Sequence, residues 1–292
     1  TELDVDCVSD GKRTVIGAIL EHVEPAGIHS GDSASVIPPM TLPSPILDKV
    51  RDYARAFARE LHVCGLMNMQ LAVRNGEIYM IEVNPRASRT VPFVSKAIGV
   101  PLAGIAARCM AGETLEQLGF TNEVRLPYTA VKEAVFPFVK FPGVDVMLSP
   151  EMKSTGEVMS IDPDRGLAYL KSQLAAGNRL PASGSVFLSV RDEDKPHAVE
   201  LARKLVELGF KLYATRGTST LLWDNGIKAQ AIYRISRGRP NLLDLIQDNG
   251  IQWIINTSEN GAEAMTDEVL MRSRALAAGI PITTTMAGMT AA

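Results

Sequence analysis

The sequence has few cysteine residues, which could cross-link a small fold, and few aromatic residues. Only 3 of its 292 residues are cysteine, and aromatic residues make up 5%. Cys7, Cys64 and Cys109 are far apart in the sequence and have no paired spacing, which argues against zinc or a disulfide framework and fits a reducing cytosol. We expect all three to be buried thiols.

Strong net charge and long apolar runs are also missing. The formal net charge of -3 provides no basic footprint for nucleic acid. No apolar run approaches the roughly 20 residues that a membrane span needs, and the opening "TELDVDCVSDGKR" lacks the layout of a signal peptide. The expectation is a cytoplasmic protein that binds neither nucleic acid nor membranes.

What is present is an ordinary globular composition, with 46% hydrophobic and 22% charged residues. The length is typical of about two domains. The chain opens in a strand-like pattern and stops at "TTTMAGMTAA", where a helical pattern begins. We therefore expect a fragment of a longer protein.

The first half mixes strand-like and helical patterns. Alternation up to about residue 23 predicts two strands around "SDGKR", and the Gly-, Ser- and Pro-rich stretch 24–45 predicts an ordered loop. A helix should begin at Ser44. "LMNMQLAV" and "EIYMIEV" predict a hairpin around Asn75 and Gly76, and two short helices should follow.

From about residue 180 strands alternate with helices, and Gly follows the helices. This pattern predicts a doubly wound parallel sheet covered on both faces. Mixed strand and turn signals occupy the region before it. We divide the chain into residues 1–115, 116–178 and 179–292.

The stretch "MIEVNPRASRT" carries the chemistry of the first part. Glu82 and Asn84 project from the same face of a predicted strand. Carboxylate and amide oxygens are ligands that Mg²⁺ prefers. Arg86 and Arg89 follow the strand, where guanidinium groups could hold a phosphate. The stretch therefore predicts a metal site for phosphoryl chemistry.

The neighbouring strand should supply a third ligand, Gln70. A strict two-residue turn would place Gln70 opposite Ile81, on the wrong face to meet Glu82. A three-residue turn or a bulge would place Gln70 opposite Glu82 and Asn68 opposite Asn84. We predict this odd register. The alternative interpretation is an exposed strand end followed by an Asn-Pro turn.

The motifs "QLAV" and "IEVNPRASRT" resemble the metal-binding hairpin of ATP-grasp ligases. Together with "GIHSGDS" and the trailing α/β region, they resemble the carboxy-terminal half of the large subunit of carbamoyl phosphate synthetase, over nearly the whole chain. The resemblance implies an α/β and α+β fold: a partial ATP-grasp domain, with helices on an antiparallel sheet, and then a parallel-sheet domain similar to methylglyoxal synthase.

The resemblance assigns roles to the first domain. Gln70, Glu82 and Asn84 would hold two Mg²⁺ or Mn²⁺ ions on ATP, with K⁺ as a further candidate, and Arg86 and Arg89 would steady the transferring phosphoryl group. The nucleotide-lining residues would be Gly27, Ile28, His29 and Ser30, with Glu2 on the ribose. Without the motif, His29 would be interpreted as a surface histidine.

The reaction implied is phosphorylation of carbamate by ATP, within synthesis of carbamoyl phosphate from bicarbonate, glutamine-derived ammonia and two ATP. It needs no nucleophilic side chain, and the sequence offers no convincing catalytic triad. The resemblance also implies a glutaminase small-subunit partner and an oligomeric parent protein. A chain that lacks the amino-terminal part of the ATP-grasp unit should not catalyse the reaction alone.

The second domain would bind nucleotide effectors such as UMP or IMP. The resemblance assigns this site to Lys195, Thr215, Thr218, Arg234, Asn256, Thr257 and Ser258. "ATRGT" ends a strand and opens a helix, where phosphate is readily bound. Ordinary helix capping is the alternative interpretation. Arg234 and Ser258 stand where the best-known members have lysine and threonine, so the effector's identity stays open.

Ornithine activation is not expected. Glu24, Asp32, Glu133 and Leu148 match the family's pocket, but "PITTT" lacks the tyrosine and aspartate of the regulatory side. Two rival functions remain. One is another ATP-grasp ligase, such as a biotin carboxylase, and the other is a nucleotide-sensing module without catalysis.

Overall fold

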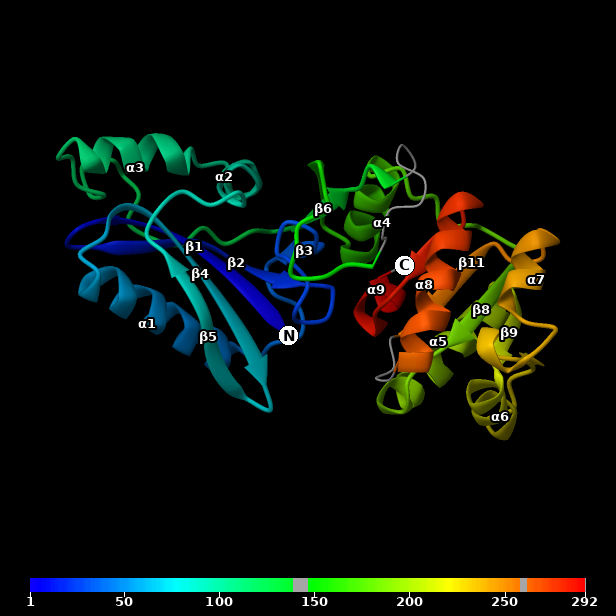
Figure 1. Ribbon diagram of the computed structural model, residues 1–292. Helices are drawn as coiled ribbons and strands as arrows, with labels where there is room; N and C mark the ends of the chain where they lie inside the picture. The colour runs from blue at the N-terminus through cyan, green and yellow to red at the C-terminus, as the bar shows by residue number, and fades with distance from the viewer. Residues whose placement is uncertain (139–146, 258–261, 292) are drawn as a thin grey trace. The chain divides into compact units, whose positions relative to one another are not determined.

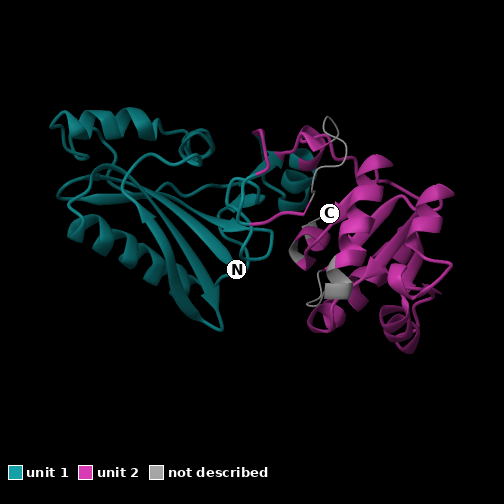
Figure 2. Cartoon of the chain, viewed as in Figure 1, with its two compact units in different colours: residues 1–134, 150–152, 157–172 teal, residues 135–149, 153–156, 173–292 magenta. Residues whose placement is uncertain are grey.

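The computed structural model describes residues 1–138, 147–257 and 262–291. The chain divides into two compact units (Figure 2). Unit 1 contains residues 1–134, 150–152 and 157–172, and unit 2 contains residues 135–149, 153–156 and 173–292. The sequence-based division at 115/116 and 178/179 stays a prediction.

Unit 1 is built on a seven-stranded sheet with the order β5-β4-β1-β2-β3-β6-β7. The strand pairs from β5 to β6 are antiparallel, as predicted. The strands are β1 (Glu2–Asp10), β2 (Thr14–His22), β3 (Ser35–Ile37), β4 (Cys64–Arg74), β5 (Glu77–Asn84), β6 (Thr129–Val135) and β7 (Gly156–Asp162); the helices are α1 (Ser44–Glu60), α2 (Val91–Ile98), α3 (Leu102–Met110) and α4 (Arg165–Ala175).

Helix α1 shows how the local pattern produces this packing. Pro45 occupies its first turn, where the missing N–H is not needed. Val50, Ala54 and Ala58 recur every four residues and are all buried, so one stripe of the helix faces the sheet. In Figure 1, α1 covers one face of the sheet while α2 and α3 cover the other.

The side chains of β1 point alternately to the two faces of the sheet. Leu3 and Val5 are buried in the core beneath α1. Val8 is buried on the other side with residues of α2 and α3. Asp4 and Asp6 share the face of Val8, because side chains two apart on a strand point the same way. One sheet face is therefore apolar under α2 and α3 and polar beyond them.

Unit 2 is a five-stranded sheet with the order β10-β9-β8-β11-β12. All its strand pairs are parallel, which confirms the doubly wound prediction. The strands are β8 (Ser185–Ser189), β9 (Lys211–Thr215), β10 (Gln230–Ile232), β11 (Trp253–Asn256) and β12 (Ile282–Thr283); the helices are α5 (Lys195–Glu207), α6 (Arg216–Asp224), α7 (Leu242–Gln247), α8 (Ala262–Ala277) and α9 (Met286–Ala291).

Residues of β8 alternate between the two cores of unit 2. Val186 and Leu188 lie in the core that includes residues of α5 and α6. Phe187 lies in the opposite core, with residues of α7 and α8. Side chains that point to both faces of a buried strand are typical of a parallel sheet with helices on both sides.

Two sequence predictions are wrong in unit 1. The stretch 24–45 is not all loop, because residues 35–37 form β3 between β2 and β6. Its short apolar run "SVI" is a strand only because both neighbours are present. Cys64 is exposed, whereas Cys7 and Cys109 are buried as predicted, and all three thiols are free.

No single helix in the described ranges is long and apolar enough to cross a membrane. Within the described residues, α2 and α3 together have the length and apolar composition of a span, but they are bent by 110° at their junction.

Candidate functional site

The β4–β5 hairpin has the register that the sequence predicts. Asn75 and Gly76 form a two-residue turn with φ of 53° and 79°. The pairing runs regularly from Arg74 to Leu71, which lies opposite Met80. The register then shifts by one residue, and Gln70 lies opposite Glu82. A β-bulge, rather than a longer turn, produces the shift.

The bulge brings the predicted ligand positions onto one face. Gln70 lies opposite Glu82, and Asn68 lies opposite Asn84. Gln70 is also the partner of Asp4 on β1. Side chains that lie opposite each other in an antiparallel pair share a face of the sheet. Oxygen-bearing side chains from three adjacent strands therefore share one face of the sheet there.

Hydrogen bonds join the side chains at the end of β5. Asn84 Nδ2 donates to Glu82 Oε1 at 2.7 Å, and Arg86 Nη2 donates to Asn84 Oδ1 at 3.3 Å. Arg86 Nη1 also donates to the carbonyl oxygen of Ala87 at 2.9 Å. Glu82 and Arg86 are exposed to solvent. The carboxylate and the guanidinium are therefore both accessible to a ligand.

The donor set suits a hard divalent cation. Gln70 and Asn84 offer amide oxygens and Glu82 offers a carboxylate, the oxygen types that Mg²⁺ and Mn²⁺ take. In this structure the amide nitrogen of Asn84 faces the carboxylate of Glu82. To bind a cation beside Glu82, Asn84 would have to turn its side-chain amide so that the oxygen faces the ion. Among the described residues, no group of three or more His, Cys, Asp and Glu side chains could hold a metal ion. A cation held by the three predicted ligands would be bound by one carboxylate and two amides.

The two predicted arginines have different surroundings. Arg86 is attached to Asn84, a predicted metal ligand. Arg89 contacts the sulfur of Met152, in a segment that also belongs to unit 1. Arg86 is thus placed beside the predicted metal ligands by a direct contact. Within the part of the chain that the structure describes, no hydrogen bond or ion pair joins Arg89 to Gln70, Glu82 or Asn84.

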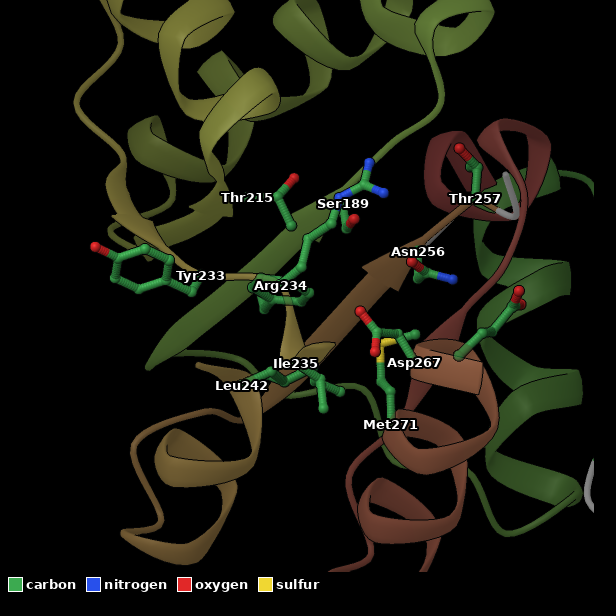
Figure 3. A pocket seen from close by; sticks show the side chains of 12 residues that line it. Ser189, Thr215, Tyr233, Arg234, Ile235, Leu242, Asn256, Thr257, Asp267 and Met271 are labelled. Atoms are coloured by element: carbon green, nitrogen blue, oxygen red, sulfur yellow. The ribbon is translucent and has the colours of Figure 1, made fainter. Parts of the chain in front are cut away.

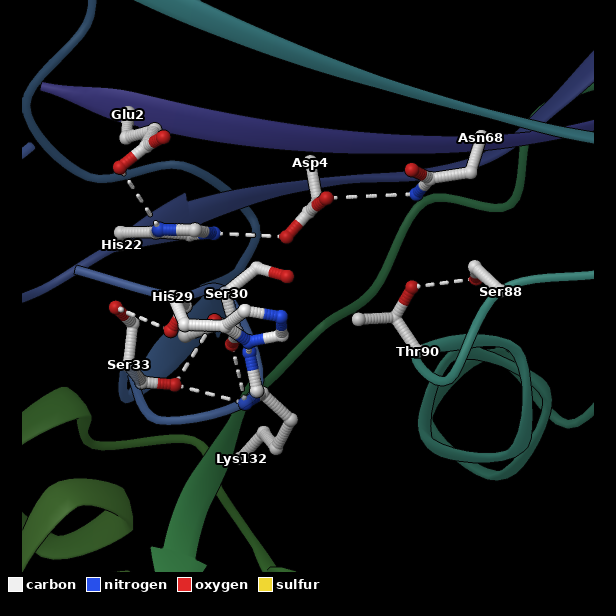
Figure 4. A network of polar contacts seen from close by, with 12 residues as sticks. Glu2, Asp4, His22, His29, Ser30, Ser33, Asn68, Ser88, Thr90 and Lys132 are labelled. Carbon is white, nitrogen blue, oxygen red and sulfur yellow. Dashed lines mark hydrogen bonds and ion pairs between the residues drawn. The ribbon is translucent and has the colours of Figure 1, made fainter. Parts of the chain in front are cut away.

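A buried polar row continues from the hairpin across β1 to β2. His22 Nε2 lies 2.8 Å from Asp4 Oδ2, and His22 Nδ1 lies 3.8 Å from Glu2 Oε2 (Figure 4). All three residues are buried. His22 Nδ1 has no hydrogen-bond partner among the described residues. The row connects Glu2 with the strand that carries Gln70.

The predicted nucleotide loop is attached to this row. The backbone N–H of Gly27 donates to Glu2 Oε2 at 3.3 Å. His29 Nδ1 accepts from the N–H of Gly31 at 3.0 Å, so this ring nitrogen supports the loop. Ile28 is half-buried. Glu2 and the loop 27–30 are therefore neighbours.

Lys132 holds the same loop from β6. Its side chain is 1% exposed. Lys132 Nζ donates to the carbonyl oxygens of Ser30 at 3.1 Å and Ser33 at 2.7 Å (Figure 4). A buried ammonium group is costly unless it is paired with acceptors. The two carbonyls meet that need and tie the loop to the sheet.

Asp6 is the centre of a second buried network. Its carboxylate is 0% exposed and accepts from Asn68 Nδ2 at 3.0 Å, from Ser88 Oγ at 2.7 Å and from Thr90 Oγ1. Burial raises the pKa of Asp6 to about 6, although the hydrogen bonds from Thr90, Ser88 and Asn68 oppose this. Asn68 Nδ2 also lies 3.4 Å from Asp4 Oδ1. The network therefore joins the buried row to the segment that follows β5.

Sequence reasoning missed Asp4, Asp6 and Lys132 as parts of this site. The signal for the acids was available, because "ELDVD" places Glu2, Asp4 and Asp6 at alternate positions of one strand. Nothing in the sequence marks Lys132, since its partners lie about 100 residues away.

Six of the seven predicted effector residues of unit 2 line hollows at the carboxyl edge of its parallel sheet. Two adjoining hollows there share Thr215, Tyr233 and Arg234. The larger has a volume of ≈ 840 Å³ and also contains Lys195 and Thr218, and the smaller, of ≈ 60 Å³, is drawn in Figure 3. The smaller is lined by Phe187, Ser189, Thr215, Tyr233, Arg234, Ile235, Leu242, Asn256, Thr257, Asp267, Glu268 and Met271.

The hollows lie where the winding of the sheet reverses. β8 is paired with β9 on one side and with β11 on the other, and the chain progresses outward in both directions. Ligands bind at such a switch point in open α/β sheets. Thr257 Oγ1 accepts from the N–H of Arg191 at 3.0 Å, and Thr218 Oγ1 accepts from the N–H of Val190 at 3.4 Å. These threonines hold the loop after β8.

The larger hollow is rich in cations. Arg191, Lys195, Arg216, Arg234 and Arg237 all line it, together with Asp192 and Glu193. A hydrogen bond from Lys195, and then the charges of Lys195 and Arg234, lower the pKa of Asp192. Arg216 lies over the ring of Tyr233, with 4.6 Å between the guanidinium carbon and the ring centroid. The hollow therefore favours an anionic ligand.

Helix α6 adds to this preference. It begins after Thr215, whose side chain makes no capping hydrogen bond. The first N–H groups of a helix have no partners within it, and the helix dipole favours an anion there. Of the predicted effector residues, Ser258 lies outside the described residues, and the other six line one or both hollows.

Two comparisons with protein families cover separate parts of the chain. Residues 1–118 match the family described as "Carbamoyl-phosphate synthase L chain, ATP binding domain". Residues 197–284 match the family described as "MGS-like domain". Among solved structures, the chain is similar to the biotin carboxylase domain of a single-chain bacterial carboxylase, with 19% identity and a TM-score of 0.48. The aligned region is 60% of this chain and 46% of that chain. That likeness is too distant to support an argument.

Curated relatives match the chain from end to end. The carbamoyl phosphate synthase large chain of Archaeoglobus fulgidus is 53% identical over 292 residues, which are 100% of this chain and 27% of that protein. The carbamoyl phosphate synthase large chain, C-terminal section, of Methanocaldococcus jannaschii is 52% identical over 302 residues, covering 100% of this chain and 49% of that one. The chain spans about a quarter to a half of the length of these relatives. It belongs to the family of carbamoyl phosphate synthase large chains.

Proposed function

We propose that the chain works as part of a carbamoyl phosphate synthase large chain, in which unit 1 helps ATP phosphorylate carbamate and unit 2 binds a regulatory nucleotide. The observation that carries the first part is the bulged register that sets Gln70 opposite Glu82. The family match over residues 1–118 supports the same assignment. The wider reaction would consume bicarbonate, glutamine-derived ammonia and two ATP.

Each predicted metal-binding or catalytic residue of unit 1 has one task in phosphoryl transfer. Gln70, Glu82 and Asn84 bind the divalent cations, either Mg²⁺ or Mn²⁺. When bound, such ions neutralise charge on the transferring phosphoryl group. Arg86 follows Asn84 by two residues and so places a guanidinium beside that group, although its hydrogen bond to Asn84 Oδ1 is given up when the amide turns toward the cation. We assign Arg89 the same task with less structural support.

The loop and its supports bind the nucleoside. Glu2 is placed for the ribose, and residues 27–30 line the nucleotide. His29 acts as a contact residue rather than a base, because its Nδ1 already accepts from Gly31. We include K⁺ as a candidate further ion. We expect the isolated chain to bind the nucleotide at most and not to turn over.

Unit 2 would act as the effector module. Its cation-rich hollow at the switch point and the uncapped start of α6 support a phosphate-bearing ligand such as UMP or IMP. We further infer a glutaminase small subunit as partner, an oligomeric parent protein and a cytoplasmic location. These follow from the family and from three free thiols.

The test of the first part uses the full-length protein. Glu82→Gln and Gln70→Leu should lower the rate of ATP formation from ADP and carbamoyl phosphate by about 100-fold or more, because electrostatic stabilisation is lost. Glu77→Gln, at the other end of β5 and exposed, is the matched control and should keep the rate. Unchanged rates in Glu82→Gln would refute the proposal for unit 1.

The alternatives predict different results. Another ATP-grasp ligase would lose ATP turnover in Glu82→Gln but would not use carbamoyl phosphate. A purely sensory protein would bind nucleotide in calorimetry, with binding lowered by Thr215→Ala and untouched by Glu82→Ala. For unit 2 itself, Lys195→Met should weaken binding of inorganic phosphate by about 10-fold. Lys228→Met, an exposed lysine outside both hollows, should not.

A further inference from the structure

We propose that Asp6 is a positioning residue for phosphoryl transfer, because it fixes segment 85–90, which carries both arginines, to the strand beside Gln70. This inference rests on the proposed function of unit 1. Asp6 does not touch any predicted ligand of the metal or nucleotide. It acts through Ser88 and Thr90.

The contacts of Asp6 span the two parts of the site. Its Oδ1 accepts from Asn68 on β4 at 3.0 Å and from Ser88 at 2.7 Å, and its Oδ2 accepts from Thr90. Ser88 and Thr90 lie 82 and 84 residues from Asp6 in the sequence. In Figure 4 their hydroxyls face each other at the start of α2, and the structure places them 2.8 Å apart.

Segment 85–90 is consequently held at both ends. At its start, Asn84 is paired with Asn68 across the β4–β5 ladder. At its end, Thr90 is bonded to Asp6. Arg86 lies between these two anchors and donates to Asn84. Asn68 contacts Asp6 and pairs with Asn84, so it belongs to both anchors.

A purely structural role explains the choice of aspartate poorly. The carboxylate is wholly buried, and its three hydrogen-bond donors are neutral. Burying a charge without a cation is costly, and apolar residues of similar volume often replace buried charges without loss of stability. An acceptor with two oxygens is, however, well suited to gather three donors from two separate segments. The burial cost is therefore better explained by the arrangement that the carboxylate maintains.

The test separates positioning from folding in the full-length protein. Asp6→Leu removes both acceptor oxygens and should lower kcat for ATP formation from ADP and carbamoyl phosphate by about 30-fold to 100-fold, since small displacements of catalytic groups have effects of this order. The KM for Mg-ADP should change less than about threefold, because Gln70 and Glu82 are untouched. Asp6→Asn should restore most of kcat, because it keeps one acceptor oxygen and a hydroxyl can also accept.

Asp10 provides the matched control. It lies on the same strand and is a structural acceptor for the N–H groups of Lys12, Arg13 and Leu115, at distances of 2.9, 2.7 and 2.8 Å. Asp10→Leu should lower the unfolding midpoint while kcat stays within about threefold of wild type. If Asp6→Leu behaves in the same way, Asp6 is structural and the inference is overturned.

A second set of variants applies if Asp6→Leu does not fold. Ser88→Ala with Thr90→Val removes the donors from the other side and should lower kcat by a similar factor. Adding Asp6→Asn to this pair should cause little further loss, because the same contact is already gone. A pair that keeps wild-type kcat overturns the inference. If Glu82→Gln keeps activity, the proposed function fails instead, so the two failures are distinguishable.

Discussion

Gln70 lies opposite Glu82, although the two-residue turn at Asn75 and Gly76 leads, by regular counting, to Ile81. One extra residue in β5 corrects this mismatch. Without the bulge, the carboxylate of Glu82 would point to the face that packs on α1. The chain thus uses a tight turn and still presents its acid and amides on the polar face.

Gly76→Ala should destabilise this hairpin. Gly76 has a φ of 79°, and an added Cβ would meet no atom within 4 Å, so the cost is one of backbone conformation alone. We expect a loss of about 1 kcal/mol in the free energy of unfolding. Gly104→Ala is the opposite case, since Gly104 is exposed within α3 and should gain up to about 1 kcal/mol. Urea denaturation followed by circular dichroism measures both, and equal signs would contradict the argument.

Lys132→Met should loosen the nucleotide loop. The variant removes the Lys132 donor from the carbonyls of Ser30 and Ser33, although the Ser33 carbonyl still accepts from Ser35 Oγ at 3.4 Å, and the cost should be about 1 to 3 kcal/mol. Mg-ATP affinity, measured by calorimetry, should fall by about 10-fold, which corresponds to about 1.4 kcal/mol. Lys96→Met, on the exposed side of α2, should change neither quantity. Unaltered affinity in Lys132→Met would show that the loop does not need this support.

The raised pKa of Asp6 gives its stability contribution a definite pH dependence. The ordinary value is 3.8 and the folded value is about 6, so the folded state holds the proton more tightly. The contribution is fully present below pH 3.8 and is lost as the pH rises through 6. Between pH 4 and 7, the free energy of unfolding of wild type relative to Asp6→Asn should fall by about 2 kcal/mol.

Asp10 should show the opposite sign. Burial acts to raise its pKa, but hydrogen bonds from the N–H groups of Arg13, Leu115 and Lys12 outweigh burial and lower it. Its contribution is therefore present above the unfolded pKa and is lost as the pH falls. Wild type should gain stability over Asp10→Asn as the pH rises through the acid range. Denaturant titrations at several pH values measure both differences, and slopes of the same sign would contradict these assignments.

Asn241→Ala should destabilise unit 2. Asn241 caps α7 by accepting from the N–H of Leu243 at 2.9 Å, and Asp244 completes the capping box. The loss should be about 1 kcal/mol. Trp223 and Trp253 both lie in unit 2, so their fluorescence follows its unfolding. Gln247→Ala, exposed in the same helix, should stay within about 0.5 kcal/mol of wild type.

The sequence by itself determined most of the longer elements and which side chains share a face of them. The alternation of strands and helices after residue 180 predicted the parallel sheet, and "MIEVNPRASRT" placed Glu82 and Asn84 together. The hypothesis that Gln70 and Glu82 share one metal site also predicted the odd register, which the bulge in β5 provides. Such features depend on residues that are near each other in the chain, where spacing and backbone geometry are sufficient.

Only the tertiary structure decided which distant residues complete the site. Asp6 meets Ser88 across 82 residues, and Lys132 meets Ser33 across 99. The short strand β3 exists because β2 and β6 lie on either side of it. These contacts depend on strand order and register across the whole sheet, and no local pattern specifies them, because the stabilising partner of each group comes from a segment far along the chain.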